Sequence, residues 1–311
     1  MKCIACRSPS APATTDLPLS SHERQLQLVF RISKQTFTSP EKKDPDIWGM
    51  SYNSVREMLY LADNNNQVLP AVVVCDCAGN LRNIYKASHD TSPVVWSVCY
   101  LSDSDTLLMC LSEVSKQGQR QIVNWLVALS RNGSTWREAH RVQTDRIGSI
   151  SCALSDSRVL IGDWTYTYME LFRVDSGQRI ERLHRIYGLE QFLWFSATCG
   201  SDTLVAMAYS TDKSVRLHLL LGVILVELAR IQLKMPTRLL WLADRLLVAD
   251  WDCEKQLDAI IELVWSKTGL ERGRELIATN EHIIVRRWCA VVDGLAIFDE
   301  NSKDILLYSF I

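Results

Sequence analysis

The most informative feature of the sequence is a repeat of about 47–49 residues, in which two short apolar runs flank a turn rich in Asp and Ser. The two clearest copies occupy residues 99–108 and 152–161, and weaker copies begin at Thr198, Leu242 and Val292. Tryptophan marks the first run of five copies, at Trp48, Trp96, Trp194, Trp241 and Trp288. A period of this length is typical of units that contain four short β-strands each.

One copy divides into four apolar runs, at residues 150–154, 159–163, 168–174 and 180–186. The runs are separated by Asp, Ser and Gly, which accept turn conformations or bond their own backbone. This pattern predicts an antiparallel meander of four strands. In the fourth copy the corresponding turn, residues 221–223, lacks such polar residues, so residues 217–233 are expected to form either two buried strands or one buried helix.

The two ends of the chain complement each other. The last copy contains three runs, at residues 285–291, 295–299 and 305–310, and no fourth run follows. Residues 25–32 alternate polar and apolar side chains but have no partner run beside them. We predict that residues 25–32 complete the last blade, which closes a ring and removes the exposed sheet edges. The first of six blades is then formed by residues 48–52, 58–63, 68–74 and 81–85.

This pattern resembles the six-bladed β-propellers of the broad group that includes NHL-type, lactonase-like and WD40-like rings, over about residues 25–311. The resemblance implies an all-β fold of six four-stranded antiparallel blades, closed by an N-terminal strand that completes the last blade. The Gly-His and Trp-Asp pairs of WD40 repeats do not recur, so the resemblance assigns an architecture and no family. Residues 1–24, rich in Ser, Pro, Thr and Ala, are predicted to be a disordered tail that precedes a single propeller domain, residues 25–311.

Charge and hydropathy argue against several classes of function. The 34 Lys and Arg residues and 36 Asp and Glu residues give a net charge of −2, so we do not expect binding to nucleic acid. The N-terminus lacks the apolar core of a secretory signal. Residues 217–233 are too short and too interrupted by charges to span a membrane. We expect a monomeric, cytoplasmic protein without membrane attachment.

The cysteines support an intracellular setting. Most of the ten lie inside apolar runs, where a free thiol behaves as a small buried hydrophobic group. Cys3 and Cys6 have the spacing of half a zinc motif, but no second half follows them, and their role stays open.

In a blade of antiparallel strands, the loops after the second strands emerge on the same face of the ring as the links between blades. Several second strands end in an acid, often beside an aromatic residue, and the links add further polar side chains. The residues predicted to form a partner-binding face are Asp163, Trp164, Tyr166, Asp250, Trp251, His89, Asp145, Arg146 and His282. Trp, Tyr and Arg contribute a large share of the binding free energy of many interfaces, so this face is expected to bind a protein or peptide. For each single residue the alternative stays open that the acids stabilise turns and the tryptophans pack between blades.

A second hypothesis starts from the acids at the ends of second strands, Asp63, Asp163, Asp250 and Asp299. Calcium takes six to eight oxygen ligands, and in lactonase-like propellers a calcium ion polarises an ester or lactone carbonyl. The resemblance therefore offers a divalent-cation-dependent hydrolase or lactonase as the alternative function. The sequence contains no Gly-x-Ser-x-Gly motif and no Gly-rich phosphate loop, and its six histidines lack metal-ligand spacing. The preferred hypothesis is a non-catalytic interaction module without a cofactor.

Two further groups of residues are interpreted as structural. The recurrent tryptophans are expected to form a packing layer between blades, because they recur at similar positions of the repeat. Two arginine groups are interpreted as solvated strand faces, namely Arg179, Arg182 and Arg185 and the pair Arg286 and Arg287.

Overall fold

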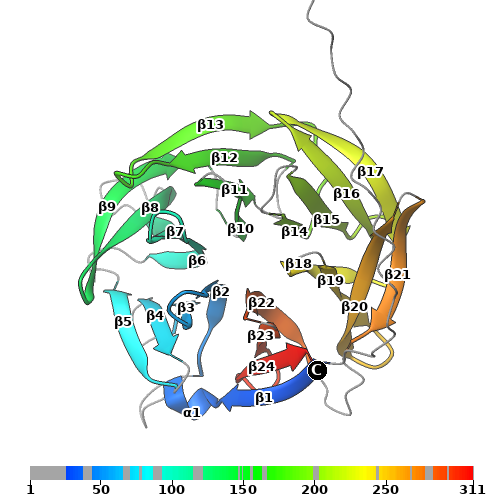
Figure 1. Cartoon of the computed structure of the whole chain (residues 1–311), viewed down its shortest axis with the longest axis horizontal. Coiled ribbons are helices and arrows are strands. Elements are labelled where there is room, and N and C mark those ends of the chain that lie inside the picture. The colour runs from blue at the N-terminus through cyan, green and yellow to red at the C-terminus, as the bar shows by residue number, and fades with distance from the viewer. Residues whose placement is uncertain are drawn as a thin grey trace, which may run out of the picture.

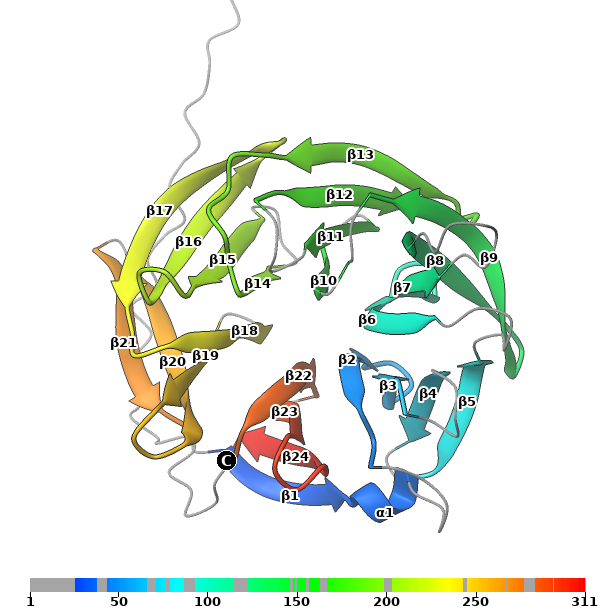
Figure 2. The ribbon, with the colours of Figure 1, turned by 180° about the vertical axis from the view of Figure 1, so that it is seen from behind.

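The structure is a computed structural model that describes residues 26–37, 44–65, 71–76, 79–86, 93–114, 122–145, 148, 150–154, 157–162, 167–198, 203–242, 245–266, 268–276, 283–292 and 294–310. Six four-stranded sheets are arranged as blades of a ring (Figure 1). In each sheet the first strand lies nearest the centre and the fourth lies at the outside, as the reverse view also shows (Figure 2). The molecule is a six-bladed β-propeller, which confirms the predicted fold class.

The strands occupy equivalent places in the six blades. The first strands are β2 (Ile47–Asn53), β6 (Val94–Leu101), β10 (Ile150–Ala153), β14 (Trp194–Ala197), β18 (Pro236–Leu242) and β22 (Val285–Val291). The second strands are β3 (Met58–Asp63), β7 (Thr106–Val114), β11 (Arg158–Gly162), β15 (Leu204–Tyr209), β19 (Arg245–Asp252) and β23 (Gly294–Asp299). The third strands are β4 (Ala71–Asp76), β8 (Ile122–Asn132), β12 (Met169–Val174), β16 (Ser214–Leu221), β20 (Leu257–Ser266) and β24 (Ile305–Phe310). The fourth strands are β5 (Leu81–Lys86), β9 (Thr135–Thr144), β13 (Ile180–Ile186), β17 (Ile224–Gln232), β21 (Gly269–Glu275) and β1 (Leu26–Ile32).

The closing strand lies where the sequence predicted it. β1 pairs antiparallel with β24, from Leu26 opposite Phe310 to Ile32 opposite Ile305, with a register shift between Leu28 and Phe30. The short helix α1 (Lys34–Phe37) then leads towards the first blade. Blade 6 therefore contains both ends of the described chain.

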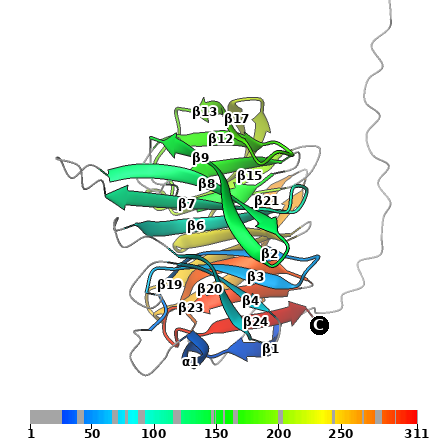
Figure 3. The same cartoon turned by 90° about the vertical axis from the view of Figure 1, so that its left-hand side faces the viewer.

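The core is divided among the interfaces between blades. Six clusters of buried apolar side chains each join two neighbouring blades. At the interface of blades 6 and 1, for example, Ile32, Ile47 and Phe298 pack together with none more than 3% exposed. Burial of apolar area supplies most of the folding free energy, at roughly 25 cal/mol per Å². The stability of the ring therefore depends on every interface between blades. A side view shows that the strands run from one face of the ring to the other (Figure 3).

The segment 217–233 folds as two strands, β16 and β17, which settles the open alternative between strands and helix. β16 is buried as expected, but the prediction that the second strand is buried is wrong. Ile224, Val226 and Leu228 are 63%, 41% and 40% exposed, because β17 is the outermost strand of its blade and no neighbouring layer covers it. Within the described part of the chain, no helix is long and apolar enough to cross a membrane.

The closing strand is expected to stabilise the whole ring. A chain that begins at residue 33 lacks β1, so it exposes the edge of β24 and loses Ile32 from the interface of blades 6 and 1. We expect its thermal midpoint, measured by circular dichroism, to fall by about 10 °C or more. A chain that begins at residue 25 keeps β1 and serves as the control for the predicted domain boundary. Equal midpoints for the two shortened chains would contradict the role of β1.

Candidate functional site

The loops after second strands and the links between blades lie together, and we call the face that they form the link face. The loop after β3 contacts the segment before β2, with Asn64 N donating to the Asp46 carbonyl at 3.1 Å. In blade 6, Glu300 N donates to the Ile284 carbonyl at 2.9 Å, and blade 5 has the same contact from Trp251 N. We call the opposite face, which carries the turns between first and second and between third and fourth strands, the turn face.

Three of the four predicted acids stabilise the starts of their own blades. Asp63, Asp250 and Asp299 are all at most 4% exposed. The Asp250 carboxylate accepts the backbone N–H groups of Lys234 at 3.2 Å and Met235 at 2.7 Å. Asp63 accepts from Asp46 N at 3.1 Å, and Asp299 accepts from Ile284 N at 3.0 Å. Each acid thus ties the end of a second strand to the segment that precedes the first strand of the same blade.

These contacts bear on the calcium hypothesis. Among the described residues, no three His, Cys, Asp or Glu side chains lie close enough together to hold a metal ion. The three acids serve separate blades, and each has backbone N–H groups as partners. The fourth predicted ligand, Asp163, lies outside the described residues. A calcium site that includes it stays a prediction.

The structure brings only part of the predicted binding face into view. Trp251 lies near the end of β19 and lines a pocket on the link face. Asp145 follows β9 and forms ion pairs with Arg185 and, at 3.9 Å, with Arg182. Arg182 and Arg185 also pair with the buried Glu170, so they are not the freely solvated strand face that the sequence suggested. Six of the predicted residues lie outside the described part of the chain, namely His89, Arg146, Asp163, Trp164, Tyr166 and His282.

A pocket of about 380 Å³, which we call the rim pocket, opens on the link face where blades 5, 6 and 1 meet. It is lined by Trp48, Thr237, Arg238, Trp251, Asp258, Ile284, Val285, Arg286, Arg287 and Glu300. A second cavity of about 320 Å³ follows the first strands along the centre of the ring. Trp48 and Arg287 line both, so the rim pocket and the central channel share a wall.

The arginines of the rim pocket owe their position to bulges at the starts of first strands. The pairing of β18 with β19 passes from Pro236 to Arg238 and skips Thr237. The pairing of β22 with β23 passes from Val285 to Arg287 and skips Arg286. β2 has the same irregularity at Trp48. Arg238 and Arg287 each follow the skipped residue, so they occupy equivalent positions in blades 5 and 6. A bulge changes the direction of the side chains beside it.

The guanidinium groups of Arg238 and Arg287 are held by backbone carbonyls and by tryptophan rings. Arg238 donates from Nε to the Arg286 carbonyl at 3.0 Å and from Nη1 to the Thr237 carbonyl at 2.7 Å. Arg287 donates from Nη1 to the Arg286 carbonyl at 2.8 Å and from Nε to the Trp48 carbonyl. Both guanidinium groups lie over the Trp194 ring, at 4.7 Å and 5.2 Å from its centroid.

The environment of Arg238 and Arg287 disfavours the charged form of their guanidinium groups. Arg287 is 8% exposed, and the prediction that it belongs to a solvated strand face is wrong because the bulge turns it into the ring. Burial lowers the pKa of Arg238 to about 10 and that of Arg287 well below its ordinary value. The positive charge of Arg238 further lowers the pKa of Arg287. In the described part of the chain, no carboxylate lies within 4.0 Å of either guanidinium group.

The acids at the rim pocket have other partners. Arg286 pairs with Glu300 and with Asp46, each at 2.7 Å. Asp258 accepts from Val285 N at 2.7 Å and from the Thr237 hydroxyl at 3.2 Å. Burial raises the pKa of the Asp258 carboxyl to about 6. Within the described ranges, Arg286 is thus paired with acids, whereas Arg238 and Arg287 are not.

The tryptophans do not form the single packing layer that the repeat suggested. Trp48 and Trp96 do pack edge to face across blades 1 and 2, with ring centroids 4.9 Å apart. Trp194 and Trp288, however, line the central channel, and both donate from Nε1 to the Leu239 carbonyl. Trp48 and Trp96 are themselves the residues skipped at the bulges of their strands, whereas Trp288 and Trp241 follow the skipped residues Arg286 and Thr237, so the tryptophans occupy different depths along the first strands.

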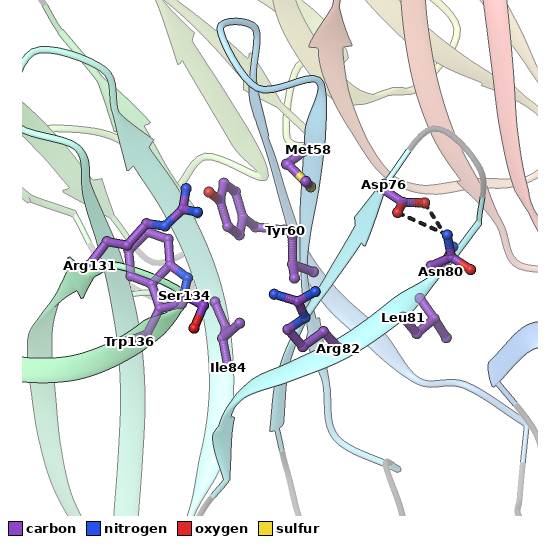
Figure 4. Close-up of a pocket in the computed structure, with 11 residues that line it drawn as sticks. Met58, Tyr60, Asp76, Asn80, Leu81, Arg82, Ile84, Arg131, Ser134 and Trp136 are labelled. Carbon is purple, nitrogen blue, oxygen red and sulfur yellow. Dashed lines mark hydrogen bonds between the residues drawn. The ribbon is translucent and has the colours of Figure 1, made fainter.

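A smaller pocket of about 90 Å³ lies on the turn face between blades 1 and 2 (Figure 4). Its main aromatic contact joins Tyr60 and Trp136, with ring centroids 5.7 Å apart, and Arg131 points towards them. Asp76 and Asn80 hydrogen-bond to each other at its edge. The volume is well below the roughly 300 Å³ of an ordinary ligand site, so the rim pocket is the stronger candidate.

Comparisons with known proteins identify the fold. No protein-family model and no curated protein matches the chain. A chain in a crystal structure of a mitotic checkpoint complex has a TM-score of 0.57 at 9% identity, over 99% of this chain and 98% of that one. A protein from Lactobacillus plantarum has a TM-score of 0.57 at 10% identity, over 86% and 81% of the two chains. Virginiamycin B lyase from Staphylococcus aureus has a TM-score of 0.51 at 11% identity, over 93% and 100%. At such identities the likeness shows the architecture alone.

Asp250 is expected to stabilise the fold whether or not a metal is present. Replacing it with alanine leaves two buried backbone N–H groups without their acceptor, so we expect the free energy of unfolding to fall by about 2–4 kcal/mol in urea titrations. Asp44 is the matched control, because its exposed carboxylate pairs with the exposed Lys34, and D44A should cost less than about 0.5 kcal/mol. Calcium should leave the wild-type midpoint unchanged. A calcium-dependent rise that D250A abolishes would support the metal hypothesis instead.

The Asp258 carboxyl is expected to make stability depend on pH. Its pKa is raised from 3.8 to about 6, so the folded state binds the proton more tightly than the unfolded state. The free energy of unfolding should therefore fall as pH rises from about 4 to about 6 and change little above that. Asn at this position removes the titration and keeps an acceptor for Val285 N. Urea titrations at several pH values should show the difference between D258N and wild type growing over this window, and parallel curves would contradict the assignment.

Proposed function

We propose that the protein is a non-catalytic interaction module that binds a protein or peptide partner on the link face, at the rim pocket. The observation that carries the proposal is the meeting of two tryptophans, Trp48 and Trp251, with three arginines in one pocket open to solvent. Tryptophan and arginine are the residues most enriched at the energetic centres of interfaces. The pocket volume of about 380 Å³ is that of a site for a few side chains.

The charge distribution also supports binding. The guanidinium groups of the buried Arg287 and the half-buried Arg238 have no paired carboxylate among the described residues, and this costs folding free energy, because their desolvation is compensated by backbone carbonyls and aromatic rings. Such a cost is common at sites where a ligand supplies the missing partner. Other described charges of the link face are paired, as at Asp145 with Arg185. Within the rim pocket, Arg286 is paired with Glu300.

The alternative function, a calcium-dependent hydrolase or lactonase, needs several oxygens that converge on one ion. The described acids instead each hold the start of a separate blade, so the geometry favours binding over metal catalysis. The likeness to virginiamycin B lyase concerns the fold. One neighbour in fold belongs to a mitotic checkpoint complex, and this is compatible with a role for the present ring in a protein assembly. We expect the protein to act as a monomer in the cytoplasm.

Peptides selected from a random library on immobilised wild-type protein are expected to depend on Trp251. W251A removes one wall of the rim pocket, so we expect it to bind the selected peptides at least tenfold more weakly by fluorescence polarisation, or about 1.4 kcal/mol. W265A is the matched control, because Trp265 lies in the same blade near the turn face and is 41% exposed. W265A should bind as the wild type does. Peptides that bind both variants equally, or a library that yields no peptide, would overturn the proposed site.

A further inference from the structure

We propose that the rim pocket binds a carboxylate group of the partner peptide between the guanidinium groups of Arg238 and Arg287. This inference rests on the proposed function and deepens it, since it names the chemical group that the pocket recognises. It starts from two neighbouring cations, the buried Arg287 and the half-buried Arg238, that have no carboxylate partner among the described residues.

The two guanidinium groups retain unused donors. Each uses Nε and Nη1 for backbone carbonyls, and among the described residues Nη2 of neither group has a hydrogen-bond partner. Arg287 is more than nine-tenths buried and lines both the rim pocket and the channel. A guanidinium group offers N–H donors in a planar fork that matches the two oxygens of a carboxylate. The free donors of Arg238 and Arg287 therefore form a preformed receptor for one anionic group.

Tryptophan rings hold these donors in place. Trp194 lies beneath both guanidinium groups, and Trp48 lies 5.8 Å from that of Arg287. Stacking on a ring face leaves the edge of a guanidinium group, where its N–H groups point, free for a ligand. The receptor is thus ordered before binding, which lowers the entropic cost of recognition.

The surrounding acids select the charge of the ligand. Asp46, Asp258 and Glu300 all lie near the pocket, and Asp46 and Glu300 are already bound by Arg286. A phosphate group carries nearly two negative charges, so the guanidinium groups attract it and the acids repel it more strongly than a carboxylate. Because Asp46, Asp258 and Glu300 balance the charges of Arg238, Arg286 and Arg287, the second negative charge gains no net attraction. A monoanion is therefore favoured. The carboxylate belongs either to an Asp or Glu side chain of the partner or to its C-terminus.

Four heptapeptide pools labelled with an uncharged dye test the inference by fluorescence polarisation. Each pool has random uncharged residues around a fixed central residue. The central residue is Glu, phosphoserine or Gln with an amidated C-terminus in three pools, and Gln with a free C-terminal carboxylate in the fourth. We expect the Glu pool or the free-carboxylate pool to bind at least tenfold more tightly than the amidated Gln pool. Which of the two binds more tightly identifies the source of the carboxylate.

Substitutions locate the binding. R287Q and R238Q each remove one guanidinium group, and each is expected to lower the affinity of the preferred pool at least tenfold, to the level of the amidated Gln pool. R245Q is the matched control, because Arg245 begins β19 at the turn face and stacks on Phe310 at 4.9 Å. It should bind as the wild type does. If neither site variant folds, the arginine Nε–H resonances of the ¹⁵N-labelled wild type decide, since those of Arg238 and Arg287 must shift with the Glu or free-carboxylate pool.

The outcomes separate the inference from the proposed function. Equal binding of all pools, with loss in W251A, would overturn the carboxylate receptor and leave the peptide site standing. Tightest binding of the phosphoserine pool would overturn the preference for a monoanion. Binding of no pool would overturn the inference and the proposed function together.

Discussion

The seam between blade 6 and blade 1 is the constraint on which both the ring and its site depend. Blades contact only their neighbours, so the ring stays closed only while the two ends of the chain remain joined at this interface. The pairing of β1 with β24 fixes the start of the described chain in blade 6. Two contacts cross the seam itself, namely the buried cluster of Ile32, Ile47 and Phe298 and the Arg286–Asp46 ion pair between residues 240 apart in sequence. The hydrogen bond from Arg287 to the Trp48 carbonyl crosses the same seam. Opening the seam would therefore also take apart the rim pocket.

The bulges explain how a plain antiparallel sheet holds buried arginines. A bulge leaves one residue of a strand without a place in the pairing. In β2, β18 and β22 the skipped residues are Trp48, Thr237 and Arg286, and the carbonyls of the same three residues accept the N–H groups of Arg238 and Arg287. One irregularity of the backbone thus both directs the side chains and supplies their acceptors. Without the bulges, these backbone carbonyls and guanidinium groups would need other hydrogen-bond partners.

The propeller architecture was predictable because the sequence repeats one pattern of apolar runs and polar turns. The period, the Asp and Ser turns and the unpaired run at residues 25–32 are local signals, and wherever the structure describes these residues they lie in a strand or a turn. The site was predictable only in part. The location of Trp251 on the link face could be predicted from the order of the strands. The sequence around Arg286 and Arg287, however, resembles that of any charged pair on a solvated strand. What distinguishes them is a register shift of one residue, which arises from pairing with β23 and has no signature of its own in the chain.

The acids were predictable as a set, but their role was not. Their position after second strands suggests convergence at a channel mouth, and the structure shows that Asp63, Asp250 and Asp299 each bind backbone N–H groups of their own blade. A carboxylate that follows a strand at a chain reversal is close to such donors, so local contacts compete with any shared ligand. The exposure of β17 has a similar origin, because an apolar run does not reveal whether its strand lies inside a blade or at its outer edge.

Comparison of equivalent positions shows that the fold itself does not require the inner arginines. The position of Arg238 and Arg287 is occupied by Gly49 in blade 1 and by Ser97 in blade 2, and each follows a register shift of the same kind. In blade 1 even a Cβ atom would lie 2.7 Å from the Ser97 backbone, so the ring is closely packed on that side. A small neutral residue is therefore sufficient to build a first strand here. The two desolvated charges are confined to blades 5 and 6, beside Trp251, and their cost to stability is most simply explained by the binding that they allow.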